Sequence, residues 1–181
     1  MRSGIKSVLT AVGVIAVQLT PIKAEDQPEA PPYEPSDAFK QIEKLEGKWT
    51  GTLSRSHLED VDLTIDYKVI SNRSAIVETM HEGDMEMISI YHDRNDELMV
   101  THYCSLRNQP VLNFSQRTDT TVSFAHDPSS GLKEGEDTFV NSYKIIHDPK
   151  NPTELRTAYT VTIPDESMWT HEGVLKKASQ D

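Results

Sequence analysis

Apolar and polar side chains alternate along most of the chain after Gly47. The alternation is clearest over residues 61–70 and 153–163, where nearly every second residue is apolar. A period of two places neighbouring side chains on opposite faces of a β-strand, so that one face is buried and the other is wet. Clusters of Asp, Asn, Gly and Pro separate the segments. We expect strands at residues 48–57, 61–70, 74–81, 84–92, 97–106, 111–118, 120–126, 138–147, 153–163 and 168–176.

This series of short strands predicts an all-β protein. The even spacing and the lack of long crossovers favour an up-and-down antiparallel β-barrel of about eight to ten strands. A two-sheet sandwich is the alternative. Closure into a barrel removes the exposed sheet edges that invite aggregation.

A short amphipathic helix is expected just before the first strand. Ser36 is a typical N-cap residue, and Phe39, Ile42 and Leu45 recur every three residues. Gly47 is expected to stop this helix. The barrel domain, with its N-terminal helix, is therefore predicted to span residues 36–181.

The beginning of the chain has the pattern of an export signal. Arg2 and Lys6 precede an apolar run over residues 8–19 that is too short to span a bilayer, which needs roughly 20 apolar residues. We expect a signal peptide at 1–24 and a disordered Pro-rich linker at 25–35, so that the protein is exported, either periplasmic or secreted. An uncleaved N-terminal anchor is the alternative.

Charge and cysteine content narrow the classes of partner. The chain has 18 Lys and Arg against 29 Asp and Glu, a formal net charge of -11, and this acidic balance argues against nucleic acid as a partner. After signal cleavage we expect no stable membrane insertion. The single cysteine, Cys104, excludes an internal disulfide and multi-cysteine metal sites, and we expect it to be buried. The sequence leaves the oligomeric state open.

Two stretches carry a resemblance to a known family. Residues 45–51 (LEGKWTG) resemble the opening of lipocalins and their relatives, the calycins. The resemblance implies that a short helix closes the barrel base and that Trp49 packs across its floor. Residues 90–93, 98–104 and 108–110 resemble a hairpin shared by uncharacterised, often exported, bacterial lipocalin-like proteins. That group implies a fold and no particular activity.

The hairpin around residues 85–104 holds the candidate site. A turn centred on Arg94 and Asn95 would place Met87 opposite His102. One face of the hairpin then carries Met85, Met87, Ser89, Tyr91, Leu98, Val100, His102 and Cys104. The other face carries Ile88, Ile90, Met99, Thr101 and Tyr103. The first face changes gradually from apolar to polar, as in small-molecule pockets, so we expect it to point inward.

We expect the barrel interior to bind a small, partly apolar molecule. The candidate ligand-binding residues are Trp49, Met85, Met87, Tyr91, Val100, His102, Cys104, Asn108 and Gln109. His102 would anchor a ligand carboxylate or hydroxyl group. The simpler interpretations are a hydrogen-bonded core histidine, a cysteine that serves as a small buried hydrophobe, and turn chemistry at Asn108 and Gln109.

Cofactors and catalysis are less favoured. Met85, Met87, His102 and Cys104 form a soft set suited to copper(I), but the methionines are more easily explained as core residues. Distant heme-binding relatives share Gly47, Trp49 and Gly51, yet no histidine here can be matched to their iron ligand. We therefore expect no cofactor. No catalytic motif is present, which favours binding over catalysis. A filled barrel with a structural or protein-interaction role is the main alternative, and an enzyme using the same cavity is the other.

Overall fold

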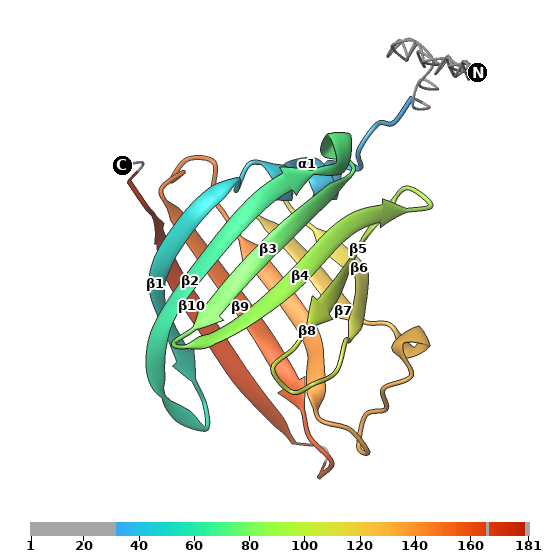
Figure 1. Cartoon of the computed structure of the whole chain (residues 1–181), viewed down its shortest axis with the longest axis vertical. Coiled ribbons are helices and arrows are strands. Elements are labelled where there is room, and N and C mark those ends of the chain that lie inside the picture. Colours follow the sequence, from blue (N-terminus) through green and yellow to red (C-terminus); the bar gives the residue numbers. More distant parts are fainter. Residues whose placement is uncertain (1–31, 166, 180–181) are drawn as a thin grey trace, which may run out of the picture. The chain divides into compact units, whose positions relative to one another are not determined.

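A computed structural model describes residues 32–165 and 167–179, and the expected signal peptide and most of the linker lie outside them. The ten expected strands all form (Figure 1). They are β1 (Gly47–Arg55), β2 (Leu58–Ile70), β3 (Ala75–Glu82), β4 (Met85–Arg94), β5 (Glu97–Tyr103), β6 (Val111–Arg117), β7 (Thr121–His126), β8 (Phe139–Ile146), β9 (Glu154–Thr162) and β10 (Met168–Lys177). Two 3-10 turns, Ser71–Arg73 and Pro128–Ser130, lie in loops.

The strands close into a single antiparallel barrel. Each strand pairs with its neighbours in sequence, and β1 also pairs with β10 to complete the ring. This confirms the all-β up-and-down barrel. Gly51 is required at the closing seam, because a Cβ atom at this position would lie 2.0 Å from the carbonyl oxygen of Val174. Within residues 32–165 and 167–179, no helix has the length and apolarity needed to cross a membrane.

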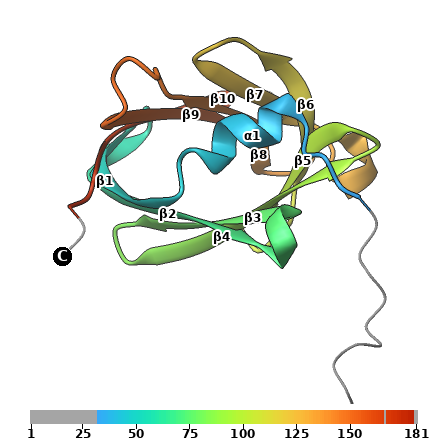
Figure 2. The ribbon, with the colours of Figure 1, turned by 90° about the horizontal axis from the view of Figure 1, so that it is seen from above.

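The helix α1 (Asp37–Glu43) lies across one end of the barrel (Figure 2). The Ser36 side chain caps it by accepting a hydrogen bond of 3.1 Å from the Phe39 backbone N–H, as expected. The helix is shorter than the sequence predicts. Gly47, with a φ of 109°, already belongs to β1 and does not serve as the helix stop. Phe39 and Ile42 of this helix are fully buried.

Trp49 belongs to this closed end. Its side chain is fully buried, and its indole Nε1 donates a 2.7 Å hydrogen bond to the carbonyl oxygen of Leu45, just after α1. A partner for the indole N–H allows a large aromatic ring to be buried without loss of a hydrogen bond. Trp49 therefore packs at the barrel base, where the resemblance places it.

The register of the hairpin formed by β4 and β5 differs from the expected one. Asn95 and Asp96 have φ angles of 54° and 65°, which makes them the two central residues of a turn with left-handed backbone. Every cross-strand pair is thereby shifted by two residues, and Ser89, not Met87, lies opposite His102. A shift of two preserves the face on which each side chain lies. The expected inward face is therefore correct although its pairing is wrong.

Candidate functional site

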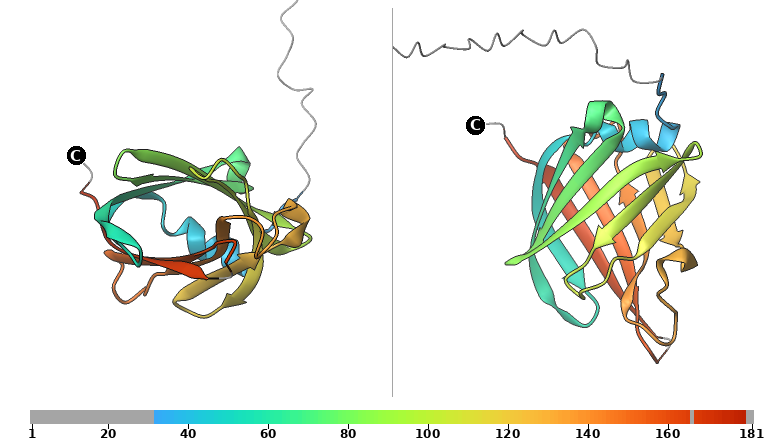
Figure 3. Two further views of the ribbon diagram at one scale, coloured as in Figure 1. Left: turned by 90° about the horizontal axis from the view of Figure 1, so that it is seen from below. Right: turned by 45° about the vertical axis from the view of Figure 1, so that its right-hand side comes forward.

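A cavity of about 250 Å³ lies inside the barrel. Its lining includes His57 from the β1–β2 turn and Leu106 from the loop after β5, and no residue of α1. The cavity therefore belongs to the end of the barrel away from the helix. The left view of Figure 3 looks at the barrel from this side, with α1 at the far end.

The cavity wall is largely apolar. Methionine, valine and leucine side chains from six strands line it: Met80, Met87, Val100, Leu112, Val140 and Val161. Few polar groups interrupt this surface in the interior, and Glu78, Ser89, His102 and Tyr143 are among the buried ones. An apolar wall with a few converging polar groups is the usual form of a small-molecule site.

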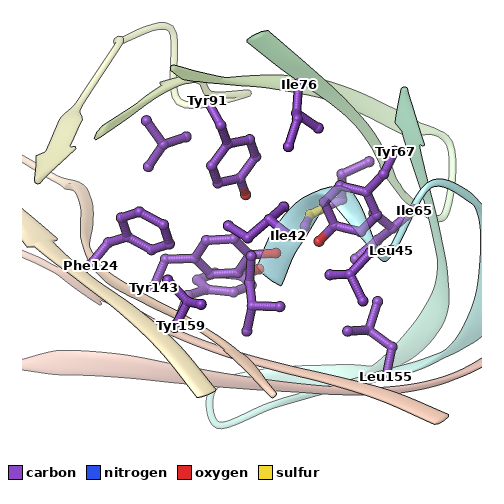
Figure 4. Close-up of a cluster of buried hydrophobic side chains, with 14 of the residues drawn as sticks. Ile42, Leu45, Ile65, Tyr67, Ile76, Tyr91, Phe124, Tyr143, Leu155 and Tyr159 are labelled. Carbon is purple, nitrogen blue, oxygen red and sulfur yellow. The ribbon is translucent and has the colours of Figure 1, made fainter. Parts of the chain in front are cut away.

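Glu78 of β3 is the centre of a buried hydrogen-bond network. Its carboxyl group is fully buried and accepts hydrogen bonds from Ser89 Oγ at 3.0 Å, Tyr91 OH at 2.8 Å and Tyr143 OH at 3.1 Å. Ser89 Oγ also lies 3.0 Å from His102 Nδ1. Figure 4 shows the rings of Tyr91 and Tyr143 directed into the barrel. A chain of hydrogen bonds thus runs from Glu78 through Ser89 to His102.

Burial changes the acidity of the groups in this network. It raises the pKa of the Glu78 carboxyl group, while the surrounding hydroxyl groups act against the rise by donating to the charged form. Burial also lowers the pKa of His102 to about 4, so the imidazole is neutral near pH 7. The pKa values of Tyr91 and Tyr143 are raised well above the usual value, chiefly by burial and then by the nearby Glu78 carboxyl group.

An aromatic cluster lines the outer part of the cavity. Tyr159 donates a 2.5 Å hydrogen bond to Glu82 and stacks on His171 with ring centroids 4.3 Å apart. His57 stacks on Trp169 at 3.9 Å. Burial raises the pKa of the Glu82 carboxyl group, although the Tyr159 hydroxyl opposes this. Flat rings and one partly buried acid therefore border the entrance.

The structure brings five of the nine predicted site residues to the cavity. These are Met85, Met87, Val100, His102 and Cys104. Met87 and His102 are buried, Met85 is 54% exposed at the rim, and Cys104 is half-buried instead of fully buried.

The other four predicted residues do not line the cavity. Trp49 lies at the closed end, and Tyr91 is directed into the barrel core, where its hydroxyl donates to Glu78. The Asn108 amide donates to the carbonyl oxygen of Thr138 at 2.8 Å, and Gln109 is exposed. Asn108 therefore ties down its loop, consistent with turn chemistry.

The described part of the chain contains no group of three or more His, Cys, Asp or Glu side chains placed to hold a metal ion. The shifted register also alters the soft set considered for copper(I). His102 faces Ser89 across the hairpin, and Met87 pairs with Met80 on β3. The expected pairing of Met87 with His102 is therefore not formed, although all four residues of the set line the cavity.

The sequence analysis does not identify Glu78, Glu82, Tyr143 or Tyr159 as site residues. Glu78 lies between Ile76 and Met80, and all three side chains share the inward face of β3. This alternation could have identified Glu78 from the sequence, because a carboxylate on the same strand face as buried apolar residues is unusual. Tyr143 and Tyr159 come from β8 and β9, and only the closed topology brings them near Glu78 and Glu82.

No family model matches the chain, and no curated protein matches it. Among solved structures, the barrel is similar to the crystal structure of a protein with unknown function of the DUF3598 family from Nostoc punctiforme, with a TM-score of 0.56 and 7% identity. That match covers 76% of this chain and 48% of the other, so the chain corresponds to about half of that protein. A redesigned β-barrel is also similar, with a TM-score of 0.35 and 14% identity, over 80% of this chain and 97% of that one. The first of these likenesses supports a barrel fold and leaves the family open.

Proposed function

We propose that this protein binds a small, partly apolar molecule inside its barrel, as a lipocalin-like carrier would. The observation that carries the proposal is the cavity of about 250 Å³ with its apolar wall and its few buried polar groups. Moving an apolar ligand from water into this space is favoured by the hydrophobic effect.

The proposal includes export. The basic residues Arg2 and Lys6, followed by the apolar run 8–19, support a signal peptide and a periplasmic or secreted protein. A carrier outside the cytoplasm would meet a small apolar molecule that needs shielding from water.

A filled barrel with an interaction role is the second candidate, and the open cavity argues against it. A catalytic role is less favoured by the geometry. In serine hydrolases the histidine stands between the serine and the acid, whereas here Ser89 stands between Glu78 and His102.

Native mass spectrometry of the mature protein, purified from its own source, tests the proposal. We expect a mass excess that disappears in a matched denatured sample, and the excess mass would identify the class of ligand. Val100→Phe, which adds a ring beside the cavity, should abolish the excess. Val174→Phe on the outer surface, where Val174 is 43% exposed, is the matched control and should retain it. A bare mass for the native protein would overturn the binding proposal.

A further inference from the structure

Glu78 places a carboxyl group deep in an apolar barrel without a cation beside it. None of the ion pairs formed within residues 32–165 and 167–179 involves Glu78. Its carboxyl group accepts hydrogen bonds from three hydroxyl groups, those of Ser89, Tyr91 and Tyr143. A buried acid is costly unless its hydrogen bonds are satisfied, so this arrangement calls for an explanation beyond packing.

The protons of this network can be assigned by counting donors. A hydroxyl group has one hydrogen to donate. Two tyrosines donate to Glu78 Oε2, and Ser89 donates to Oε1. These three bonds stabilise the ionised carboxylate, while burial acts against them and raises the pKa of Glu78. When Glu78 is ionised, the only hydrogen of the Ser89 hydroxyl is used on the carboxylate, so Ser89 Oγ accepts a hydrogen bond from His102 Nδ1 at 3.0 Å.

This assignment decides what His102 offers to the cavity. A neutral imidazole carries one N–H, and a proton on Nδ1 leaves a lone pair on Nε2. None of the hydrogen bonds between described residues uses His102 Nε2. Nε2 is also not one of the fully buried polar atoms that lack a hydrogen-bond partner, so it remains accessible. Since His102 lines the cavity, Nε2 is available to a molecule within it.

We propose that Glu78 and Ser89 hold His102 in the Nδ1–H tautomer, so that Nε2 accepts a hydrogen bond from a neutral ligand bearing a hydroxyl or amide N–H group. This inference rests on the proposed binding function and names the ligand class. It selects the hydroxyl-type anchor and excludes the carboxylate, the two options that the sequence leaves open for His102.

The charges around the cavity agree with the exclusion of anions. Among the described lining residues, Arg55 is the only Lys or Arg. Its Nε and one terminal nitrogen both donate to the carbonyl oxygen of Glu59, near the start of β2. Glu78 and Glu82 are the acids of the lining. A ligand carboxylate beside His102 would face a lone pair and a nearby carboxylate, and Arg55 is the one Lys or Arg side chain among the described lining residues that could offset them.

The tautomer can be measured without any ligand. Long-range ¹H–¹⁵N correlation spectra of ¹⁵N-histidine-labelled protein distinguish protonated from unprotonated ring nitrogens. We expect a protonated Nδ1 and a bare Nε2 for His102 at pH 7.5. A protonated Nε2 with a bare Nδ1 would overturn the proposal.

The Glu78→Gln variant sharpens this measurement, because it should reverse the direction of the hydrogen bonds that link residue 78 through Ser89 to His102. The glutamine oxygen is expected to face the two tyrosine donors, which places its NH₂ group toward Ser89. Ser89 then accepts from the amide and donates to His102 Nδ1, so the proton moves to Nε2. Glu86→Gln is the matched control, because Glu86 is exposed on the same strand as Ser89 and pairs with His81 on the outside. Glu86→Gln should leave the His102 tautomer unchanged. A change of tautomer in both variants, or in neither, contradicts the proposed hydrogen-bond chain from Glu78 to His102.

The ligand class is tested with three probes that share one ring system: 2-naphthol, 2-naphthaldehyde and 2-naphthoate. Calorimetric titration at pH 7.5 should show 2-naphthol binding about tenfold more tightly than the aldehyde, which cannot donate a hydrogen bond. The carboxylate should bind on the order of 100-fold more weakly than 2-naphthol. In Glu78→Gln the preference for the alcohol over the aldehyde should fall by about tenfold, since Nε2 becomes a donor.

The outcomes separate the two proposals. Binding of 2-naphthoate as tight as that of 2-naphthol would overturn the ligand class and leave the binding function standing. No binding of any probe, together with a bare native mass, would overturn the binding function itself. If Glu78→Gln does not fold, Ser89→Ala cuts the same chain and leaves Glu78 in place. It should give a mixture of His102 tautomers, and a pure Nδ1–H form in that variant would contradict the role of Ser89.

Discussion

The two ends of the barrel differ in how far their large apolar side chains are buried. At the closed end, Phe39 and Ile42 of α1 and Trp49 of β1 are fully buried. At the open end, Leu58, Met85 and Leu106 border the cavity with 54%, 54% and 40% of their surface exposed. Large exposed apolar groups are a liability unless a partner or ligand covers them. The comparison indicates that the α1 end contributes more to stability than the open end. At the open end, apolar side chains stay exposed, and this leaves the cavity accessible to a ligand.

The chain's two tryptophans offer the largest test of this comparison. Trp49→Ala should lower the free energy of unfolding by about 3–5 kcal/mol, because it removes a fully buried ring and leaves a cavity. Trp169→Ala at the mouth, where the ring is half-buried and stacks on His57, should cost about 1 kcal/mol or less. Urea denaturation followed by far-ultraviolet circular dichroism measures both. Equal losses would contradict the contrast between the two ends.

Acid should weaken the interior through His102. The pKa of His102 is lowered from 6.5 to about 4 by burial, so the unfolded chain binds more protons between these values. Stability is therefore lost as the pH falls from about 6.5 to about 4, by up to about 3 kcal/mol for this group. Glu78, with a raised pKa, acts in the opposite direction, since its ionised form is the one that burial disfavours.

The His102 contribution is isolated by comparing the wild type with His102→Phe. The free energy of unfolding of both proteins is measured from pH 7 to pH 4. As the pH falls, the wild type should lose stability relative to His102→Phe. His171 also has a pKa lowered to about 4, chiefly by burial, and remains in both proteins, so its effect cancels. A difference that does not vary with pH would show that His102 is not buried in neutral form.

The docking of α1 depends on Asp93 of β4. Its carboxylate accepts hydrogen bonds of 2.7 Å from both the Ser36 hydroxyl and the Ser36 backbone N–H, and one of 3.0 Å from Tyr33 OH. Asp93→Ala should lower the free energy of unfolding by about 2 kcal/mol, as for hydrogen bonds to a charged group. Asp66→Ala, an exposed position on β2, is the control and should be within about 0.5 kcal/mol of wild type. Ligand binding at the opposite end should change in neither variant.

Sequence periodicity predicts the barrel well because half-buried strands are patterned locally. The helix N-cap at Ser36 is also a local signal, and it is confirmed by the hydrogen bond to Phe39. The register of β4 and β5 could not be obtained in the same way. It depends on which residues take left-handed backbone, and here Asn95 and Asp96 do so, while Arg94 remains in β4.

The candidate site shows the same boundary between local and distant information. His102 and Cys104 could be assigned to the interior because alternation places them on one face of the hairpin and the graded polarity of that face is typical of a pocket. The partners of Glu78 could not, because Tyr143 lies 65 residues away along the chain and reaches Glu78 only after the barrel closes. Strand pairing between distant segments is set by the whole topology, which single-strand patterns do not encode.

The smallest expected effect concerns Cys104, the only cysteine of the chain. Burial raises the pKa of its thiol, and the thiolate is the reactive form, so alkylation by iodoacetamide at pH 7.5 should be about tenfold slower than for a cysteine in the unfolded chain. Because Cys104 lines the cavity, a bound ligand should slow the reaction further by several-fold. A Cys104→Ala, Val174→Cys variant carries its thiol on the outside of β10 and should react at one rate with or without ligand. Protection of both thiols would indicate that the ligand binds the outer surface, and protection of Cys104 alone would locate it in the open half of the barrel.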